Sequence, residues 1–280
     1  MFKIKKKEQL SKVITLLEID APLIARKAEP GQFVIIRVNE HGERIPLTIA
    51  DFDIETGTIS IIVQAIGKTT KMLSMLEVGD NVLDLVGPLG MPTKVGNPKK
   101  VAVIGGGVGC AIAYPQAKAL YNAGVEVDII AGFKDKDFVI IEDRMQKVSD
   151  NLYITTDDGS YGEKGFVTDK LNALIKAGKD YDLVIAIGPV PMMRSVADMT
   201  KEYEIKTIVS LNPIMIDGTG MCGGCRVTVG GKIKFACVDG PDFDGHQVDF
   251  EELMLRNSTY RESERKAHTC RLDGGVGKDV

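Results

Sequence analysis

Three cysteines in the last third of the chain have the residue type and the spacing of a metal site. Cys222 and Cys225 are separated by two glycines, and Cys237 follows twelve residues after Cys225. Cysteine thiolates are soft ligands that select iron-sulfur clusters or zinc. The other two cysteines, Cys110 and Cys270, lie in different contexts, so the fourth ligand is expected from within the loop itself.

An aspartate supplies that fourth ligand in our interpretation. Asp217 stands five residues before Cys222, where a plant-type C-x4-C-x2-C run carries its first cysteine. We therefore predict a 2Fe-2S cluster bound by Asp217, Cys222, Cys225 and Cys237. Glycines let the backbone bend around the cluster and direct N–H groups at its sulfurs; they are Gly218, Gly220, Gly223 and Gly224. A structural zinc knuckle is the alternative, although its usual fourth ligand is Cys or His, and a disulfide is a weaker one.

A glycine-rich loop in the middle of the chain has the context of a diphosphate site. It follows a buried strand and opens a helix, so backbone N–H groups can bind an anion. The residues expected to bind cofactor here are Gly105, Gly106, Gly107, Val108 and Gly109. Cys110 replaces the last glycine of G-x-G-x-x-G, and no acidic residue ends the next strand, which disfavours the usual Rossmann dehydrogenase. A tight turn that needs only small residues is the alternative.

Two later segments end strands at the same expected edge of the sheet. Carboxylates of the first can accept hydrogen bonds from ribose, and methionine of the second can pack on a flat ring. The predicted cofactor-binding residues are Asp157, Asp158, Gly159, Gly188, Pro189 and Met192. Taken alone, the first segment is equally a polar turn and the second is core packing. Lys134 and Lys136 leave the choice between NAD and NADP open.

Two loops in the first third of the chain can bind a second phosphate group. One places a cation, a proline and a hydroxyl in succession, and the other opens a short helix with free amides. The predicted cofactor-binding residues are Arg44, Pro46, Leu47, Thr48, Ile49, Val63, Gln64, Gly67, Lys68, Thr69 and Thr70. Two phosphate-type sites and an electron-carrying cluster together indicate one redox relay.

These sites require three structural parts. Residues 1–96 alternate short branched strands with turn signals, which predicts a small β-barrel with one helix at 69–76. Residues 97–212 alternate strand and helix, which predicts an α/β domain with a parallel sheet. Residues 213–245 form the cluster-binding segment, with a hairpin at Gly230 and Gly231. Residues 246–280 form a charged, partly helical tail that is a candidate for partner docking.

Composition excludes several other classes. The net charge is only −4 at pH 7, which argues against a nucleic-acid partner bound through broad phosphate neutralisation. The longest apolar run, at 101–114, is too short to cross a bilayer and the chain opens without a secretory signal, so we expect no membrane partner. Five cysteines, three of them clustered, suit a reducing compartment, and we predict a cytoplasmic protein.

With these motifs the chain resembles the ferredoxin-NADP reductase superfamily. The run from Arg44 to Thr48 resembles its flavin loop, 67–70 its flavin diphosphate loop, and 105–109 its nicotinamide-nucleotide loop. With a cluster segment appended, the resemblance narrows to the electron-transfer subunits of dihydroorotate dehydrogenase. The resemblance narrows further to the small subunits of NADH-dependent ferredoxin:NADP oxidoreductase. Asp217 favours this second group over the first, because the dihydroorotate relatives have four cysteines where this chain has three and an aspartate.

The resemblance implies an oxidoreductase subunit with FAD, a 2Fe-2S cluster and NAD(H). It implies hydride exchange at FAD and single-electron transfer to a larger flavin and iron-sulfur subunit in a heterodimer, with ferredoxin and NADP reached indirectly and electron bifurcation as the overall reaction. Because cofactors carry such chemistry, we assign no catalytic residue. An electron-transfer subunit of dihydroorotate dehydrogenase is the first alternative, and a zinc-stabilised, non-redox nucleotide-binding protein is the second.

Overall fold

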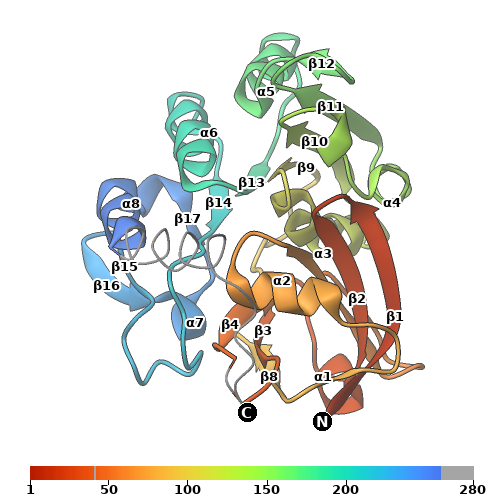
Figure 1. The fold of residues 1–280 in the computed structure, drawn as a ribbon. Helices are drawn as coiled ribbons and strands as arrows, with labels where there is room; N and C mark the ends of the chain where they lie inside the picture. The colour runs from red at the N-terminus through yellow and green to blue at the C-terminus, as the bar shows by residue number, and fades with distance from the viewer. Residues whose placement is uncertain (41, 260–280) are drawn as a thin grey trace.

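The first part of the chain forms two antiparallel sheets around one core. The computed structural model describes residues 1–40 and 42–259. The sheets have the strand orders β5-β6-β2-β1-β7 and β4-β3-β8 (Figure 1). The strands are β1 (Phe2–Ser11), β2 (Ile14–Asp20), β3 (Phe33–Arg37), β4 (Ile45–Thr48), β5 (Asp51–Asp53), β6 (Thr58–Gln64), β7 (Asn81–Val82) and β8 (Asp84–Leu89). The helices are α1 (Pro22–Ala25) and α2 (Lys68–Met75).

Branched side chains explain why this part folds as a barrel. Ile19, Ile36 and Ile61 come from strands of both sheets and are completely buried in the same core. Alternate residues of each strand point inward, and branched residues pack well on such pleated surfaces. The expected β-barrel at the N-terminal end is therefore present, with α2 one residue earlier than predicted.

The second part is a seven-stranded sheet of order β12-β11-β10-β9-β13-β14-β17. Neighbouring strands are parallel except for β17, which is antiparallel to β14. The strands are β9 (Lys100–Gly106), β10 (Glu126–Phe133), β11 (Asn151–Thr156), β12 (Glu163–Lys164), β13 (Leu183–Ile187), β14 (Thr207–Ser210) and β17 (Asp242–Asp244). The helices are α3 (Gly109–Asn122), the 3-10 turn η1 (Lys136–Phe138), α4 (Glu142–Gln146), α5 (Val167–Lys176) and α6 (Val190–Glu202).

Both faces of this sheet are covered. Val101 and Val103 of β9 pack in the core that contains α3, whereas Ala102 and Ile104 pack in the core on the side of α5 and α6. A strand buried on both faces reads as a continuous apolar run, which is why β9 was predictable. Helix α6 was missed, because the segment that begins at Gly188 was interpreted only as the end of a strand; proline in fact starts a helix well.

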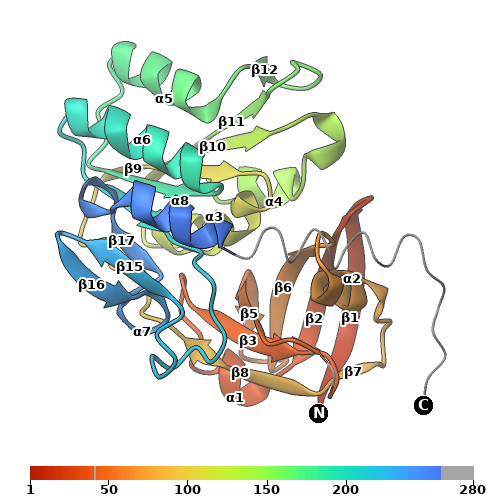
Figure 2. The ribbon, with the colours of Figure 1, turned by 60° about the vertical axis from the view of Figure 1, so that its left-hand side comes forward.

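The third part joins the other two. It contains β15 (Arg226–Val229), β16 (Lys232–Phe235), α7 (Ala236–Asp239), the 3-10 turn η2 (Gly245–Gln247) and α8 (Phe250–Ser258). The predicted hairpin is confirmed: Gly230 and Gly231 have φ of 58° and 71°, as a tight type I′ turn requires. Strand β17 extends the parallel sheet, and Figure 2 shows α8 beside α6.

The predicted partly helical tail begins with α8, and its portion beyond residue 259 lies outside the described residues. Within the described residues, no helix is both long enough and apolar enough to span a membrane.

Candidate functional site

The glycine loop lies at the point where the strand order of the sheet reverses. Strand β9 has β10 on one side and β13 on the other, so the loop after β9 opens at a topological switch point. Gly109 is required for packing, because a Cβ there would lie 2.3 Å from the carbonyl oxygen of Ile187. A Cβ at Gly106 would lie 2.5 Å from the sulfur of Met192. The loop therefore needs small residues both for packing and for backbone access.

A cavity of about 650 Å³ lies beside this loop. Six predicted cofactor-binding residues line it: Gln64, Gly106, Gly107, Asp157, Pro189 and Met192. Gln64 comes from the barrel, so the cavity opens toward the border between the barrel and the parallel sheet. A nucleotide fits these walls, since exposed glycine backbone suits a diphosphate and apolar side chains suit a ring.

The hydroxyl of Thr155 marks the same cavity as a ligand site. Thr155 is 2 % exposed, its Oγ1 has no hydrogen-bond partner, and it lines the cavity at the end of β11. Buried hydroxyls are normally paired, so this group is available to a bound molecule. Sequence reasoning missed it, because a threonine inside an apolar strand carries no signal of its own.

Two aromatic residues of the cavity were also missed. Phe138 follows β10 in η1, and Phe166 precedes α5 with 63 % of its side chain exposed. An exposed phenylalanine beside a cavity can pack on a flat ring. The sequence feature that could have identified them is an aromatic residue in a segment that follows a strand: Phe166 comes directly after Gly165, and Phe138 directly after Asp137.

The remaining predicted residues of the sheet edge lie around the cavity without lining it. Gly105, Val108, Gly109 and Gly188 form the turn and its packing, and Asp158 and Gly159 lie in the turn after β11. Asp158 accepts hydrogen bonds from Ser160, which lower the pKa of its carboxyl group. Their roles in binding stay predictions.

In the barrel, the segment predicted as a loop with a cation, a proline and a hydroxyl forms strand β4 directly after Arg44. Pro46 pairs with Ile35 of β3, and β4 is an edge strand, where proline is tolerated. Leu47 and Thr48 are half-buried in the same strand. Ile49 and Val63 are each 1 % exposed and fill the barrel core.

The loop at 67–70 forms the N-terminal turn of α2, as predicted. Gly67 is the N-cap, and Lys68 begins the helix. The hydroxyl of Thr70 accepts hydrogen bonds from the amides of Ile66 and Gly67, and Thr69 donates to Glu43. The helix is therefore capped by its own side chain.

The hairpin brings two of the three predicted cysteine ligands together. Strands β15 and β16 place Cys225 and Cys237 with their sulfurs 3.1 Å apart, and both residues are buried. Burial, followed by the contact with Cys225, raises the pKa of Cys237 to about 12. Cys222 is exposed, and the amide of Gly224 lies 3.5 Å from its sulfur, as expected for an N–H directed at a ligand.

Asp217 lies on the same loop as a fixed carboxylate. Its oxygens accept hydrogen bonds from the amides of Thr219, at 2.7 Å, and Cys222, at 3.0 Å, and from the Thr219 hydroxyl. These bonds, that of the Thr219 hydroxyl first, hold the pKa of Asp217 well below its usual range. Three cysteine thiolates suit an iron-sulfur cluster, and Asp217 stands at the position of the first cysteine of a plant-type run. Among the described residues, no three His, Cys, Asp or Glu side chains lie together in a way that could hold a metal ion, so the structure does not bring the four predicted ligands into one group.

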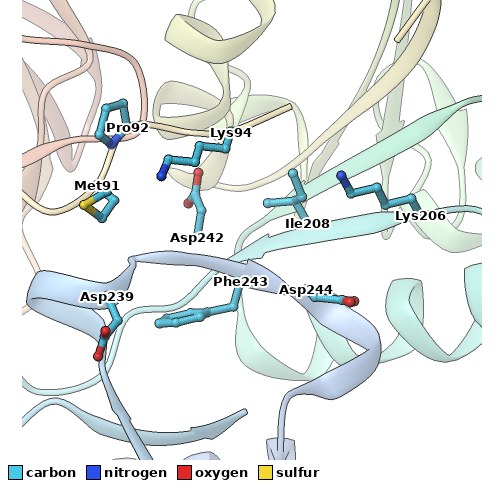
Figure 3. A pocket seen from close by; sticks show the side chains of 9 residues that line it. All are labelled: Met91, Pro92, Lys94, Lys206, Ile208, Asp239, Asp242, Phe243 and Asp244. Carbon is cyan, nitrogen blue, oxygen red and sulfur yellow. The ribbon is translucent and has the colours of Figure 1, made fainter. Parts of the chain in front are cut away.

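A smaller cavity of about 220 Å³ lies where the three parts meet (Figure 3). Asp242 of β17 accepts hydrogen bonds from Thr93, at 2.6 Å, and from Gln116 of α3, at 3.3 Å. Burial raises the pKa of its carboxyl group. Figure 3 shows Lys94 and Lys206 on opposite sides of Ile208. None of the predicted site residues lines this cavity. The hydrogen bonds of Asp242 with Thr93 and Gln116 hold the three parts of the protein together.

The fold and these sites define a class of two-domain reductases with an appended cluster segment. A ferredoxin reductase of carbazole 1,9a-dioxygenase shares the fold, with a TM-score of 0.61, 20 % identity and coverage of 72 % of this chain and 64 % of that chain. Residues 212–249 match the family model of the iron-sulfur cluster binding domain of dihydroorotate dehydrogenase B. That match contains all four predicted metal ligands.

Whole-chain relatives give the family. A Thermotoga maritima homologue of the dihydroorotate dehydrogenase B (NAD(+)) electron transfer subunit is 48 % identical, covering 94 % of this chain and 92 % of its own length. The electron transfer subunit of Bacillus cereus strain G9842 is 34 % identical and covers 84 % and 93 %. The chain belongs to the family of dihydroorotate dehydrogenase B electron transfer subunits, and it is an oxidoreductase subunit.

A solved structure is similar over nearly the full length. A chain of an NADH-dependent reduced ferredoxin-NADP oxidoreductase, studied for flavin-based electron bifurcation, superimposes with a TM-score of 0.92 at 46 % identity and covers 98 % of both chains. The expected fold class, superfamily and cofactor types, FAD, NAD(H) and a 2Fe-2S cluster, are thereby confirmed.

Proposed function

We propose that this chain is the electron-transfer subunit of an electron-bifurcating NADH-dependent ferredoxin:NADP oxidoreductase. The observation that carries the proposal is the 46 % identity over 98 % of both chains to a protein of that description. The predicted ligands support the same assignment: Asp217, Cys222 and Cys225 lie on a loop next to the barrel, and Cys237 lies in α7.

The chemistry comes from the cofactors, and the chain positions them. When bound, FAD would accept the hydride of NADH, which is two electrons and a proton, and would release the proton and supply the electrons one at a time to the 2Fe-2S cluster. The glycine loop and Thr155 bind the nucleotide, and Gln64 brings the barrel to the same cavity. The barrel residues at 44–49 and 67–70 bind the flavin. No side chain is assigned as a general acid or base.

We further propose a division of the chain by cofactor. Residues 1–96 bind FAD, 97–212 bind NAD(H), 213–245 bind the cluster, and 246–280 include a partner-docking tail. The cluster segment is not an independent unit, since its strand β17 belongs to the nucleotide sheet.

The proposed partner is a larger flavin and iron-sulfur subunit, through which electrons reach ferredoxin and NADP. Apolar side chains surround the candidate ligands: Met221 is 88 % exposed beside Cys222, and Val238 is 41 % exposed beside Cys237. Exposed apolar residues around an electron exit are typical of a protein contact.

Cofactor analysis of anaerobically purified protein tests the proposal. We expect about one FAD, two irons and two acid-labile sulfides per chain, with flavin bands and a broad red shoulder in the visible spectrum. A colourless protein that contains zinc would contradict it and support the non-redox alternative.

The second candidate, an electron-transfer subunit of dihydroorotate dehydrogenase, is favoured by the family match at 212–249. Its partner and reaction distinguish it. NADP reduction that needs both NADH and reduced ferredoxin, in the complex with a large subunit, supports the first function. Oxidation of dihydroorotate with NAD, in a complex with a barrel-type flavin subunit, supports the second.

A further inference from the structure

An arginine of the barrel reaches the loop that carries the candidate cluster ligands. Arg44 precedes β4, and its Nε donates a hydrogen bond to the carbonyl oxygen of Ile216 at 3.2 Å. Its Nη1 pairs with Asp84 of β8 at 2.9 Å. One guanidinium group therefore connects two barrel segments to the residue directly before Asp217.

A second contact holds the same loop against the barrel. Gly218 is buried with φ of 80°, and a Cβ at this position would lie 2.8 Å from side-chain carbons of both Ile35 and Leu89. Only glycine allows this approach, because a side chain would meet strands β3 and β8. Figure 2 shows the segment between β14 and β15 running beside these strands.

The two contacts lie on either side of Asp217. The Ile216 side chain is 55 % exposed, so its backbone carbonyl, not its side chain, anchors the loop. Asp217 in turn fixes the amides of Thr219 and Cys222. The orientation of the carboxylate therefore depends on where the barrel holds residues 216 and 218.

We propose that Arg44 is a positioning residue that ties the flavin loop of the barrel to the cluster loop and sets the orientation of Asp217. The inference rests on the proposed function only where it treats Asp217 as a cluster ligand. The fork of the guanidinium is essential, since its nitrogens serve the carboxylate and the carbonyl at once in fixed directions. An ion pair of Arg44 with Asp84 alone would matter little, because both groups are partly exposed.

Arg44→Lys is the test variant, because lysine keeps the charge and loses the fork. Arg144→Lys is the matched control: Arg144 pairs with Glu8 between the two domains, also at 2.9 Å, with 33 % of its side chain exposed against 31 % for Arg44. Both variants are made in the full chain, purified with its cofactors, and compared by amide hydrogen exchange.

We expect exchange of the Thr219 and Cys222 amides to become about five- to tenfold faster in Arg44→Lys and to stay unchanged in Arg144→Lys. Amides of the β15–β16 hairpin serve as an internal reference and should not change. In the iron-loaded protein, the electron paramagnetic resonance spectrum of the reduced cluster should also change in Arg44→Lys alone.

Unchanged exchange of the two loop amides in Arg44→Lys would overturn the proposal, and so would an equal acceleration in the hairpin. The exchange measurement does not need iron, so absence of a cluster would reject the proposed function without deciding the role of Arg44. If Arg44→Lys loses global stability, Asp84→Asn replaces it, with the same loop amides expected to exchange faster by a smaller factor.

Discussion

Two aspartates, one in the nucleotide sheet and one in the cluster loop, accept the same number of protein hydrogen bonds in different surroundings. Asp128 of β10 is completely buried and accepts from Asn151, Lys179 and Tyr181 at 2.6–2.8 Å. Asp217 lies on a partly exposed loop and accepts from its own neighbours in sequence. Both carboxyl groups have a lowered pKa.

The difference lies in what each carboxylate can give to a ligand. Burial opposes the ionisation of Asp128, and hydrogen bonds from Lys179, Tyr181 and Asn151 outweigh it, so those donors must stay in place. Hydrogen bonds from Thr219 and Cys222 favour the ionised form of Asp217, and burial opposes it only slightly. One of its oxygens accepts only the amide of Cys222, so this oxygen keeps a lone pair for a metal while the bonds to the loop stay in place. A low carboxyl pKa therefore indicates a structural role in one region and an available ligand in the other.

The largest effect is expected from Asp128→Ala. The substitution leaves the buried hydroxyl of Tyr181 and the ammonium of Lys179 without their acceptor, which should cost roughly 3 kcal/mol in the free energy of unfolding. Urea denaturation at neutral pH measures this loss, and iron content per folded chain should not change. Asp128→Asn keeps one acceptor oxygen and should lose less. A loss below about 1 kcal/mol for the alanine variant would contradict the structural role.

The sequence contains a local signal for the cluster loop and none for the aspartate network of the sheet. Cys222, Cys225 and Asp217 are neighbours in sequence, so their spacing carries the signal. Asp128 meets partners 23 to 53 residues away, and no local pattern relates them. The same reason explains why the pairing of β17 with β14 was missed, since an antiparallel edge strand contributed by the cluster segment has no signature in the α/β pattern.

Buried strands and glycine turns were predictable because they follow local rules. The run at 101–104 is apolar on both faces, and the glycine-rich loop at 105–109 lies where helix α3 meets β13. The site residues that were missed, Thr155, Phe138 and Phe166, acquire their role only when three strand ends meet at one cavity. Tertiary placement, not residue type, makes them candidates.

A smaller effect is expected from pH. Because the pKa of Asp128 is lowered in the folded protein, its contribution to stability is present above the unfolded value near 3.8 and is lost as the pH falls through the folded value. The stability difference between the wild type and Asp128→Asn should therefore be constant between about pH 7 and 5 and should shrink below about pH 4.

Urea titrations of both proteins across this range provide the measurement. A difference that grew on acidification would mean that Asp128 is protonated more readily in the folded state, which would reverse the assigned direction of its pKa shift.

The smallest effect on stability, and the most specific one, is expected from Asp217→Cys. The variant should keep its iron, because cysteine supplies the fourth thiolate of a plant-type set. Its thermal unfolding midpoint should stay close to the wild-type value, since the carboxylate lies on a partly exposed loop. The reduction potential should shift on the order of 100 mV, because the identity of a ligand is among the factors that set the potential of a cluster.

Two further variants make this result decisive. Asp217→Ala should lose most of its iron, whereas Asp239→Asn, which changes a nearby carboxylate that binds the amide of Phe235, should retain it. Redox titration followed by electron paramagnetic resonance, with iron analysis of each protein, gives the comparison. An unchanged potential and spectrum in Asp217→Cys would exclude Asp217 as a ligand. Asp217 and Asp128 would then differ only in how deeply they are buried, because neither carboxylate would bind a metal.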